Sequence, residues 1–168
     1  MTVPIEQMLG ILLDALNTAL VADGTREDMC SCTIYPGDAV PMDYGLEECG
    51  GMAWVRLVST GPTTAFPATS ISVDNCFYTL AYTVEMGIMR PAPVPEQFGS
   101  EVQLPDDTAH YDSSIRLMQD MRLMHSAIKD AKRDIPLLVL GTWTPQGPQG
   151  GTVGGMWTLT IGDEDEDD

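Results

Sequence analysis

Residues 76–89 read CFYTLAYTVEMGIM, and their character alternates with a period of two. The odd-numbered and even-numbered positions therefore fall on opposite faces of a predicted strand. One face carries Cys76, Tyr78, Leu80, Tyr82, Val84, Met86 and Ile88, and the other carries Phe77, Thr79, Ala81, Thr83, Glu85 and Gly87. This alternation predicts a long strand with one buried face. A length of 14 residues exceeds the usual strand of about five or six, which favours an extended sheet that reaches beyond its own core.

Shorter strands are predicted on both sides of this one. They cover residues 29–35, 52–59, 137–144 and 156–161. Pro36, Gly37 and Asp38 end the first of them. Between the last two lies PQGPQGGTVGG, residues 145–155, which contains five glycines. So many glycines predict a long hairpin or a loop that makes close backbone contacts.

Two helices are predicted from apolar residues that recur every three or four positions. The first begins at Thr2, Val3 and Pro4 and ends at Asp23 and Gly24. Its apolar stripe consists of Ile5, Met8, Leu9, Leu12, Leu13, Leu16 and Leu20. The second covers residues 108–132, with acidic residues at its start and basic residues at its end, as the helix dipole favours. Residues 90–105 hold four prolines and are predicted to form an extended connector.

The order of these elements is a helix, three strands, a helix and two strands. Because strands and helices do not alternate, the order predicts an α+β fold with a mainly antiparallel sheet of about four to five strands. The second helix would pack on the sheet. We expect one domain over residues 1–162, followed by a disordered acidic tail at residues 163–168.

The net charge is strongly negative. Eight Lys and Arg residues oppose 25 Asp and Glu residues, for a net charge of −17, and the body without its last six acidic residues still carries −11. Such a surface repels nucleic-acid phosphates and anionic membranes, so we expect neither DNA-specific nor membrane binding. An acidic wall would let a duplex slide past; a simpler explanation is that the charge only keeps the protein in solution. No apolar run near 18 residues and no secretory signal are seen in the sequence.

Residues suited to chemistry do not form a recognisable site. The four cysteines are Cys30, Cys32, Cys49 and Cys76, and their spacing matches no common zinc pattern, so free, small buried thiols are expected in a reducing cytoplasm. The glycine-rich segment lacks the lysine of a phosphate-binding loop. No cysteine stands in the sequence context of a nucleophile. We therefore expect no catalytic residue, no cofactor and no metal, and we expect that the protein is not an enzyme.

Three segments resemble tail-terminator proteins of long-tailed actinobacterial phages. Residues 141–161, GTWTPQGPQGGTVGGMWTLTI, are similar to the ending of those proteins, a pattern of paired glycines and tryptophans. Residues 49–56, CGGMAWVR, resemble a Cys-Gly-x-x-x-Trp-Val-Arg element, and residues 85–90, EMGIMR, resemble a strand that ends in Gly-x-x-Arg. Pro91 and Thr152 stand where cysteines would be expected, so no cysteine-based site is carried over.

The resemblance implies a structural role in the virion, at the junction of tail and neck, after assembly in the host cytoplasm. Six subunits would form a ring that caps the tail tube and docks to the head–tail connector or stopper, and DNA would pass through the bore without specific binding. The partners would be identical copies, the tail tube protein and the connector. We expect subunit or partner contacts at Trp54, Arg56, Glu85, Arg90, Trp143, Pro145, Gly147, Pro148, Gly150, Gly151, Gly154, Gly155 and Trp157.

Two alternatives stay open at this stage. A neighbouring neck protein, such as a head–tail stopper or a minor tail protein, would share most of these features. A non-viral acidic protein-binding module would account for the charge without any ring.

Overall fold

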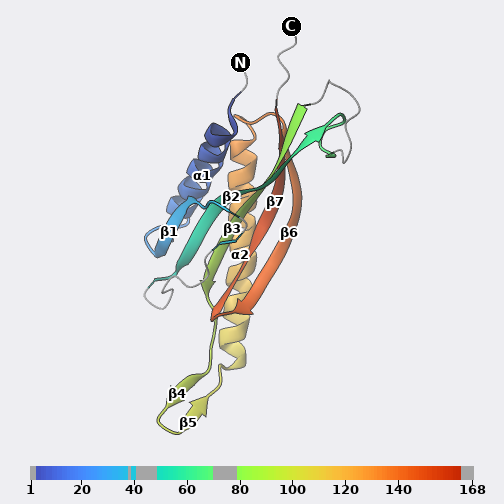
Figure 1. Cartoon of the computed structure of the whole chain (residues 1–168). Helices are drawn as coiled ribbons and strands as arrows, with labels where there is room; N and C mark the ends of the chain where they lie inside the picture. The colour runs from blue at the N-terminus through green and yellow to red at the C-terminus, as the bar shows by residue number, and fades with distance from the viewer. Residues whose placement is uncertain (1–2, 38, 41–48, 70–78, 164–168) are drawn as a thin grey trace.

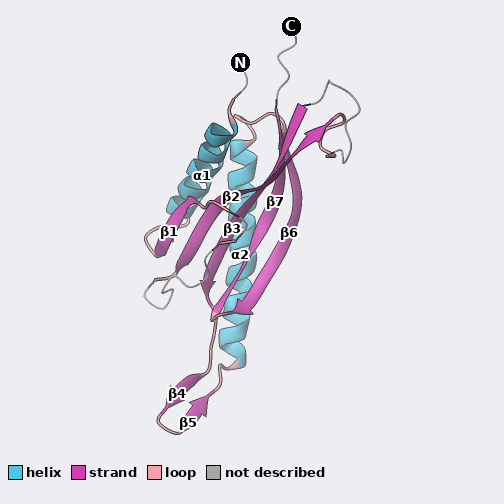
Figure 2. Ribbon diagram, viewed as in Figure 1, coloured by secondary structure: helices cyan, strands magenta, loops and turns pink. Residues whose placement is uncertain are grey.

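The computed structural model describes residues 3–37, 39–40, 49–69 and 79–163. Two helices lie on one face of a five-stranded sheet, and a small two-stranded sheet projects from the end of the molecule (Figures 1 and 2). The elements are α1 (Ile5–Ala22), β1 (Met29–Ile34), β2 (Gly51–Thr63), β3 (Thr79–Pro91), β4 (Glu96–Phe98), β5 (Glu101–Gln103), α2 (Asp107–Ala131), β6 (Leu138–Gln149) and β7 (Thr152–Gly162). The predicted α+β class is confirmed, with a helix first and a second helix packed on the sheet.

The main sheet has the order β1-β2-β3-β7-β6. β1 runs parallel to β2, and the other three pairs are antiparallel. β3 is the central strand, and Met86 lies between Val55 of β2 and Trp157 of β7. Its described part extends to Pro91, and the predicted start at residues 76–78 lies outside the described residues.

The main core lies between the helices and one sheet face. Each central strand contributes every second residue to it, such as Val55, Met86 and Leu159, all of which are fully buried. α2 begins with a cap, because the Asp106 carboxylate accepts a hydrogen bond from the Ala109 backbone N–H at 2.8 Å. Both helices pack on this same face of the sheet.

α1 is long and apolar enough, by length and composition, to cross a membrane: its 18 residues have a mean hydropathy of 1.4. The expectation that no segment reaches this length is therefore wrong. The buried residues of the helix are Met8, Leu9, Leu12, Leu16 and Leu20. They form one stripe that packs into the main core, so packing accounts for these apolar residues.

The segment predicted as an extended connector contains a hairpin instead. β4 and β5 pair antiparallel, from Glu96 opposite Gln103 to Phe98 opposite Glu101. Gly99, at the turn, has a φ of 64°, which glycine adopts without strain. The prolines at positions 91, 93 and 95 all precede the hairpin, so they do not interrupt its ladder.

The glycine-rich segment at residues 145–155 is a tight hairpin whose strands continue nearly to its end. β6 runs to Gln149 and β7 starts at Thr152. Gly150 and Gly151 form the two-residue connection with φ values of 57° and 74°. Positive φ at both positions is the condition of the turn that best suits a twisted hairpin, and this explains the pair of glycines.

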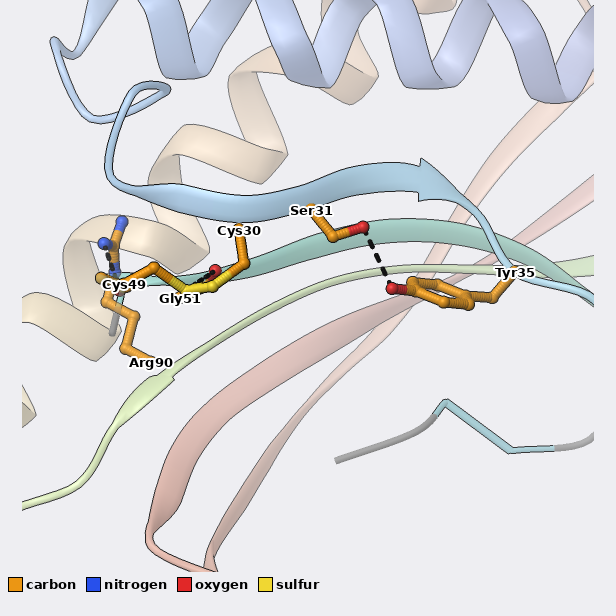
Figure 3. The surroundings of a disulfide bond; sticks show 7 residues. Cys30, Ser31, Tyr35, Cys49, Gly51 and Arg90 are labelled. Atoms are coloured by element: carbon orange, nitrogen blue, oxygen red, sulfur yellow. Dashed lines mark hydrogen bonds between the residues drawn. A yellow bond between two sulfur atoms is a disulfide. The ribbon is translucent and has the colours of Figure 1, made fainter. Parts of the chain in front are cut away.

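A disulfide joins Cys30 of β1 to Cys49, just before β2 (Figure 3). The Cα atoms are 5.7 Å apart, within the range that disulfides require. The expectation of free thiols is wrong for these two cysteines. Cys32 is free and half-buried, and burial raises the pKa of its thiol despite the opposing charge of Arg26. Cys76 lies outside the described residues.

Asp163, placed by the sequence at the start of the acidic tail, is held against the sheet. Its carboxylate accepts a hydrogen bond from the Tyr82 hydroxyl at 3.1 Å, and its N–H donates to the Leu80 carbonyl. Burial raises the pKa of Tyr82, and the nearby Asp163 carboxylate raises it further. The rest of the predicted tail, residues 164–168, lies outside the described residues.

Candidate subunit interface

The main sheet ends in two strands that are each paired on one side only within the described part of the chain. β1 forms one edge over six residues, and β6 forms the other over 12. An edge strand presents a row of N–H and C=O groups that another chain can pair with. These two edges are therefore the places where a second sheet can be added.

The two edges run in opposite directions. β1 points the same way as β2 and β7, and β6 points the opposite way. When one copy stands beside another in the same orientation, β6 of the first and β1 of the second are antiparallel. Such a contact joins two different surfaces, so it repeats from copy to copy and closes into a ring when the rotation allows.

Trp54, one of the residues predicted to lie at a contact, is fully buried inside the subunit. It packs on the sheet face opposite the helices, with Val40, Met52 and Met89. Gly87 lies beneath its ring: a Cβ at Gly87 would be 2.5 Å from Trp54 Cε2. Its indole Nε1 has no hydrogen-bond partner among the described residues.

Arg56 and Glu85 form a cross-strand ion pair on that same face. They are opposite each other in the β2–β3 register, and the Arg56 Nε and Nη2 atoms are both 2.7 Å from Glu85 Oε2. The side chains are only 12% and 14% exposed. The pair is therefore satisfied within the subunit.

Arg90 is part of a network that ties β3 to both helices. Its Nε and Nη2 atoms donate to both carboxylate oxygens of Asp120 at 2.6 and 2.9 Å. Arg116 contacts the same carboxylate at 3.1 Å and also donates to Asp23, after α1, at 2.8 Å. The hydrogen bond from Arg116 holds the pKa of Asp23 below its ordinary value of 3.8. Asp120 is buried on α2, so this network fixes the position of α2 on the sheet.

Trp143 and Trp157 lie on the helix side of the sheet. The Trp157 indole N–H donates to the Met121 carbonyl of α2 at 3.1 Å. Trp143 lies over Gly155, where a Cβ would be 2.5 Å from Trp143 Cζ2. Both tryptophans are only partly buried and pack against the main core.

The structure thus brings most of the predicted contact residues into one region of β2, β3, β7 and β6. Gly154 and Gly155 are buried there, where β3 and Trp143 approach closely. The exposed members are Pro145, Gly147, Pro148, Gly150 and Gly151, all on the β6–β7 hairpin. A role of these residues in subunit contacts stays a prediction, and the hairpin is where a neighbour can reach them.

A surface that the sequence did not single out is the projecting segment at residues 94–112, here called the arm (Figure 1). Neither of its strands joins the main sheet. Its exposed apolar side chains are Val94 at 48%, Phe98 at 61%, Val102 at 61%, Leu104 at 70% and Tyr111 at 65%. The signal in the sequence was the presence of Val94, Phe98, Val102 and Leu104 in the segment predicted to be an extended connector.

The helix layer carries a groove of about 1080 Å³ between α1 and α2. Ile11, Ala15, Ala19 and Leu123 contribute apolar surface to it, and Arg122 and Arg133 lie along its α2 side. In the described residues, no group of three or more His, Cys, Asp or Glu side chains could hold a metal ion.

The fold defines an α+β domain in which, over the described residues, the main sheet has two edge strands paired on one side only. No protein-family model matches the chain, and no curated protein matches it either.

Proposed function

We infer that this chain is a structural ring subunit of the tail-terminator type. In this proposal, identical copies form a ring that caps a phage tail tube and joins it to the head–tail connector or stopper. DNA passes through the bore without specific binding, and the protein is not an enzyme.

The observation that carries the proposal is the opposite direction of the two sheet edges. Because β1 and β6 run in opposite senses, copies in the same orientation can extend one antiparallel sheet from subunit to subunit. β6 is 12 residues long, which is long for an edge strand that pairs on one side only in the described structure. Proteins usually shorten or cover such edges, so a long open edge favours pairing with another chain.

The segments that resemble tail terminators support the proposal through their placement. They lie far apart in the sequence, yet they fall on β2, β3, β6 and β7, which are adjacent in the sheet. Trp54 on Gly87 and Trp143 on Gly155 are contacts within these segments. The segments therefore form one structural unit, as expected if they characterise one fold.

The charge supports passage of DNA rather than binding. A subunit with a net charge of −17 presents an acidic surface in many copies around a ring. Phosphates are repelled by such a surface, and a duplex can move along it without being held.

The test is depletion of the chain from the phage that carries its gene, followed by electron microscopy of the tails. A protein that caps the tube stops its growth, so tubes of excess length that are not joined to heads are expected. Tails of normal length joined to heads would contradict the proposal. Tails of normal length without heads would instead indicate a head–tail stopper, and cryo-EM of the intact particle would place the chain directly.

A further inference from the structure

The arm is unusual because it exposes apolar surface without support from the body. Its two strands pair only with each other in the described structure, and an isolated two-stranded hairpin is marginally stable in water. Phe98 and Val102 are each 61% exposed, and Leu104 is 70% exposed. Apolar side chains gathered in this way mark a site of protein contact.

The arm is also acidic. The acidic residues within it are Glu96, Glu101, Asp106, Asp107 and Asp112, and no Lys or Arg occurs between Arg90 and Arg116. Its partner must therefore supply both apolar surface and positive charge. On a molecule with a net charge of −17, few surfaces meet the second condition.

The cations of this chain reduce the choice to one surface. Four arginines already have partners within the chain. Arg26 donates to Asn17. The other three form ion pairs: Arg56 with Glu85, Arg90 with Asp120, and Arg116 with Asp23. The four others, half of the total, are Arg122, Lys129, Lys132 and Arg133, which we call the basic strip. All four are exposed: Arg122 and Lys129 lie on α2, and Lys132 and Arg133 directly follow it. Within the described residues only Arg133 forms an ion pair, with the exposed Asp130 at 3.4 Å.

The groove between α1 and α2 adjoins this strip and supplies the apolar surface. Arg122 and Arg133 of the strip line the groove beside Leu123, and Ile11 and Ala15 face them from α1. Acidic residues line both sides of the groove: Asp14 and Asp23 on the α1 side, with Asp23 paired to Arg116, and Asp130 and Asp134 on the α2 side, with Asp130 paired to Arg133. The acidic side chains of an arm would therefore lie along the exposed basic strip, where Arg122 and Lys129 have no ion-pair partner among the described residues, and its apolar side chains would enter the groove.

We propose that the arm of one copy docks on the basic strip and the α1–α2 groove of a second copy. This contact joins two different surfaces, as the pairing of β6 with β1 does, and it adds a second link between neighbouring subunits. It deepens the proposed function, since it names the surfaces that would hold the ring together. It does not depend on the position of the ring in a particle.

The test measures the mass of the purified full-length chain in solution by analytical ultracentrifugation. Glu96→Lys with Glu101→Lys reverses the charge of the arm, and Arg122→Glu with Lys129→Glu reverses that of the strip. Each pair of substitutions places like charges together, so we expect self-association roughly a hundredfold weaker than in the unmodified chain. The chain that carries all four substitutions should recover its association, because the charges are again complementary.

The matched control is Glu6→Lys with Glu27→Lys, which makes the same change at two exposed glutamates outside the arm. It should associate as the unmodified chain does. All substituted residues are exposed, and circular dichroism shows whether each variant folds. An unmodified chain that stays at 18.2 kDa at every concentration, an arm variant that associates as tightly as the unmodified chain, or a fourfold variant that does not recover would each overturn the contact. Normal ring assembly by the arm variant would overturn this inference and leave the proposed function standing.

Discussion

Two glycines of the sheet leave room for tryptophan rings and are not needed for backbone flexibility. Gly87 and Gly155 both have ordinary backbone angles, so their conformation alone does not require glycine. What requires it is the ring that lies over each of them, Trp54 over the first and Trp143 over the second. The pairing of a small residue with a large one on neighbouring strands fixes the position of each ring.

Gly87→Ala should therefore destabilise the protein. Its Cβ would overlap the fully buried Trp54 ring, and overpacking of a core typically costs about 1–3 kcal/mol. Gly10→Ala in α1 is the matched control, because a Cβ there meets nothing within 4 Å and alanine favours a helix by about 0.5–1 kcal/mol. Urea denaturation measures both; a Gly87→Ala protein as stable as the unmodified one would contradict the packing.

A second prediction concerns the buried ion pair of Arg90 and Asp120. Asp120→Ala would leave the buried Arg90 guanidinium without its carboxylate, which costs about 3–5 kcal/mol. Asp130→Ala, on the same helix, removes an exposed pair with Arg133 and should change stability by less than about 1 kcal/mol. The free energies of unfolding from urea titrations test the difference, and equal losses in the two variants would be the contrary result.

At the scale of elements, the disulfide depends on how the chain crosses the sheet. Because β1 is parallel to β2, with Met29 opposite Gly51, the chain must return to the same end of the sheet before β2 begins. That return brings Cys49 beside Cys30 (Figure 3). The parallel pairing and the disulfide therefore support each other.

Reduction of this disulfide should destabilise the domain. The two cysteines are 19 residues apart, and release of a loop of this size costs roughly 3 kcal/mol in the chain-entropy description. A reducing agent should therefore lower the melting temperature of the unmodified chain and of Cys32→Ser, but not that of Cys30→Ser with Cys49→Ser. A melting temperature of the unmodified chain that is insensitive to the reductant would contradict this expectation.

The elements that the sequence predicted well are those with a local pattern. The apolar stripe of α1 and the alternation in β3 both follow from the side chains that enter the main core, and such a pattern can be read from neighbouring residues. The single buried face expected for β3 is wrong, because Ala81, Gly87 and Met89 on its other face are buried as well. The hairpin of β4 and β5 was missed because the prolines before it argue against strands, although Glu96 begins the first strand only after the last of them.

Contacts between distant residues were not predictable in the same way. The parallel pairing of β1 depends on the path of residues 35–50, and no local pattern indicates a direction. Arg90 and Asp120 are 30 residues apart, and neither residue type alone shows that they pair. The predicted contact residues were identified by resemblance, and the burial of Trp54 among them became apparent only with its packing in the structure.

At the scale of the whole molecule, helices cover one face of the main sheet, and its two edge strands each pair on one side only in the described part of the chain. Ile34, near the end of β1, is 37% exposed on one of those edges. In a ring built by strand pairing, this residue would lie at the junction of two subunits.

Ile34→Lys should therefore weaken ring formation, because a lysine on an edge strand opposes the addition of another strand. Val21→Lys is the matched control: Val21 is 59% exposed, but it lies on the helix α1 and not on an edge strand. Native mass spectrometry of the two variants tests the edge. A ring that forms equally well with Ile34→Lys would argue against strand pairing at β1.

The arm lies at one end of the long axis, and the start of α1 and the end of β7 lie at the other (Figure 1). In a ring whose members all share one orientation, every arm emerges on one rim, and the start of α1 and the end of β7 are collected on the other. Such a ring has two chemically different faces, so it is polar along its axis. A joint between a tube below and a portal above needs this asymmetry, and a tag fused to either terminus would decorate only the rim opposite the arms.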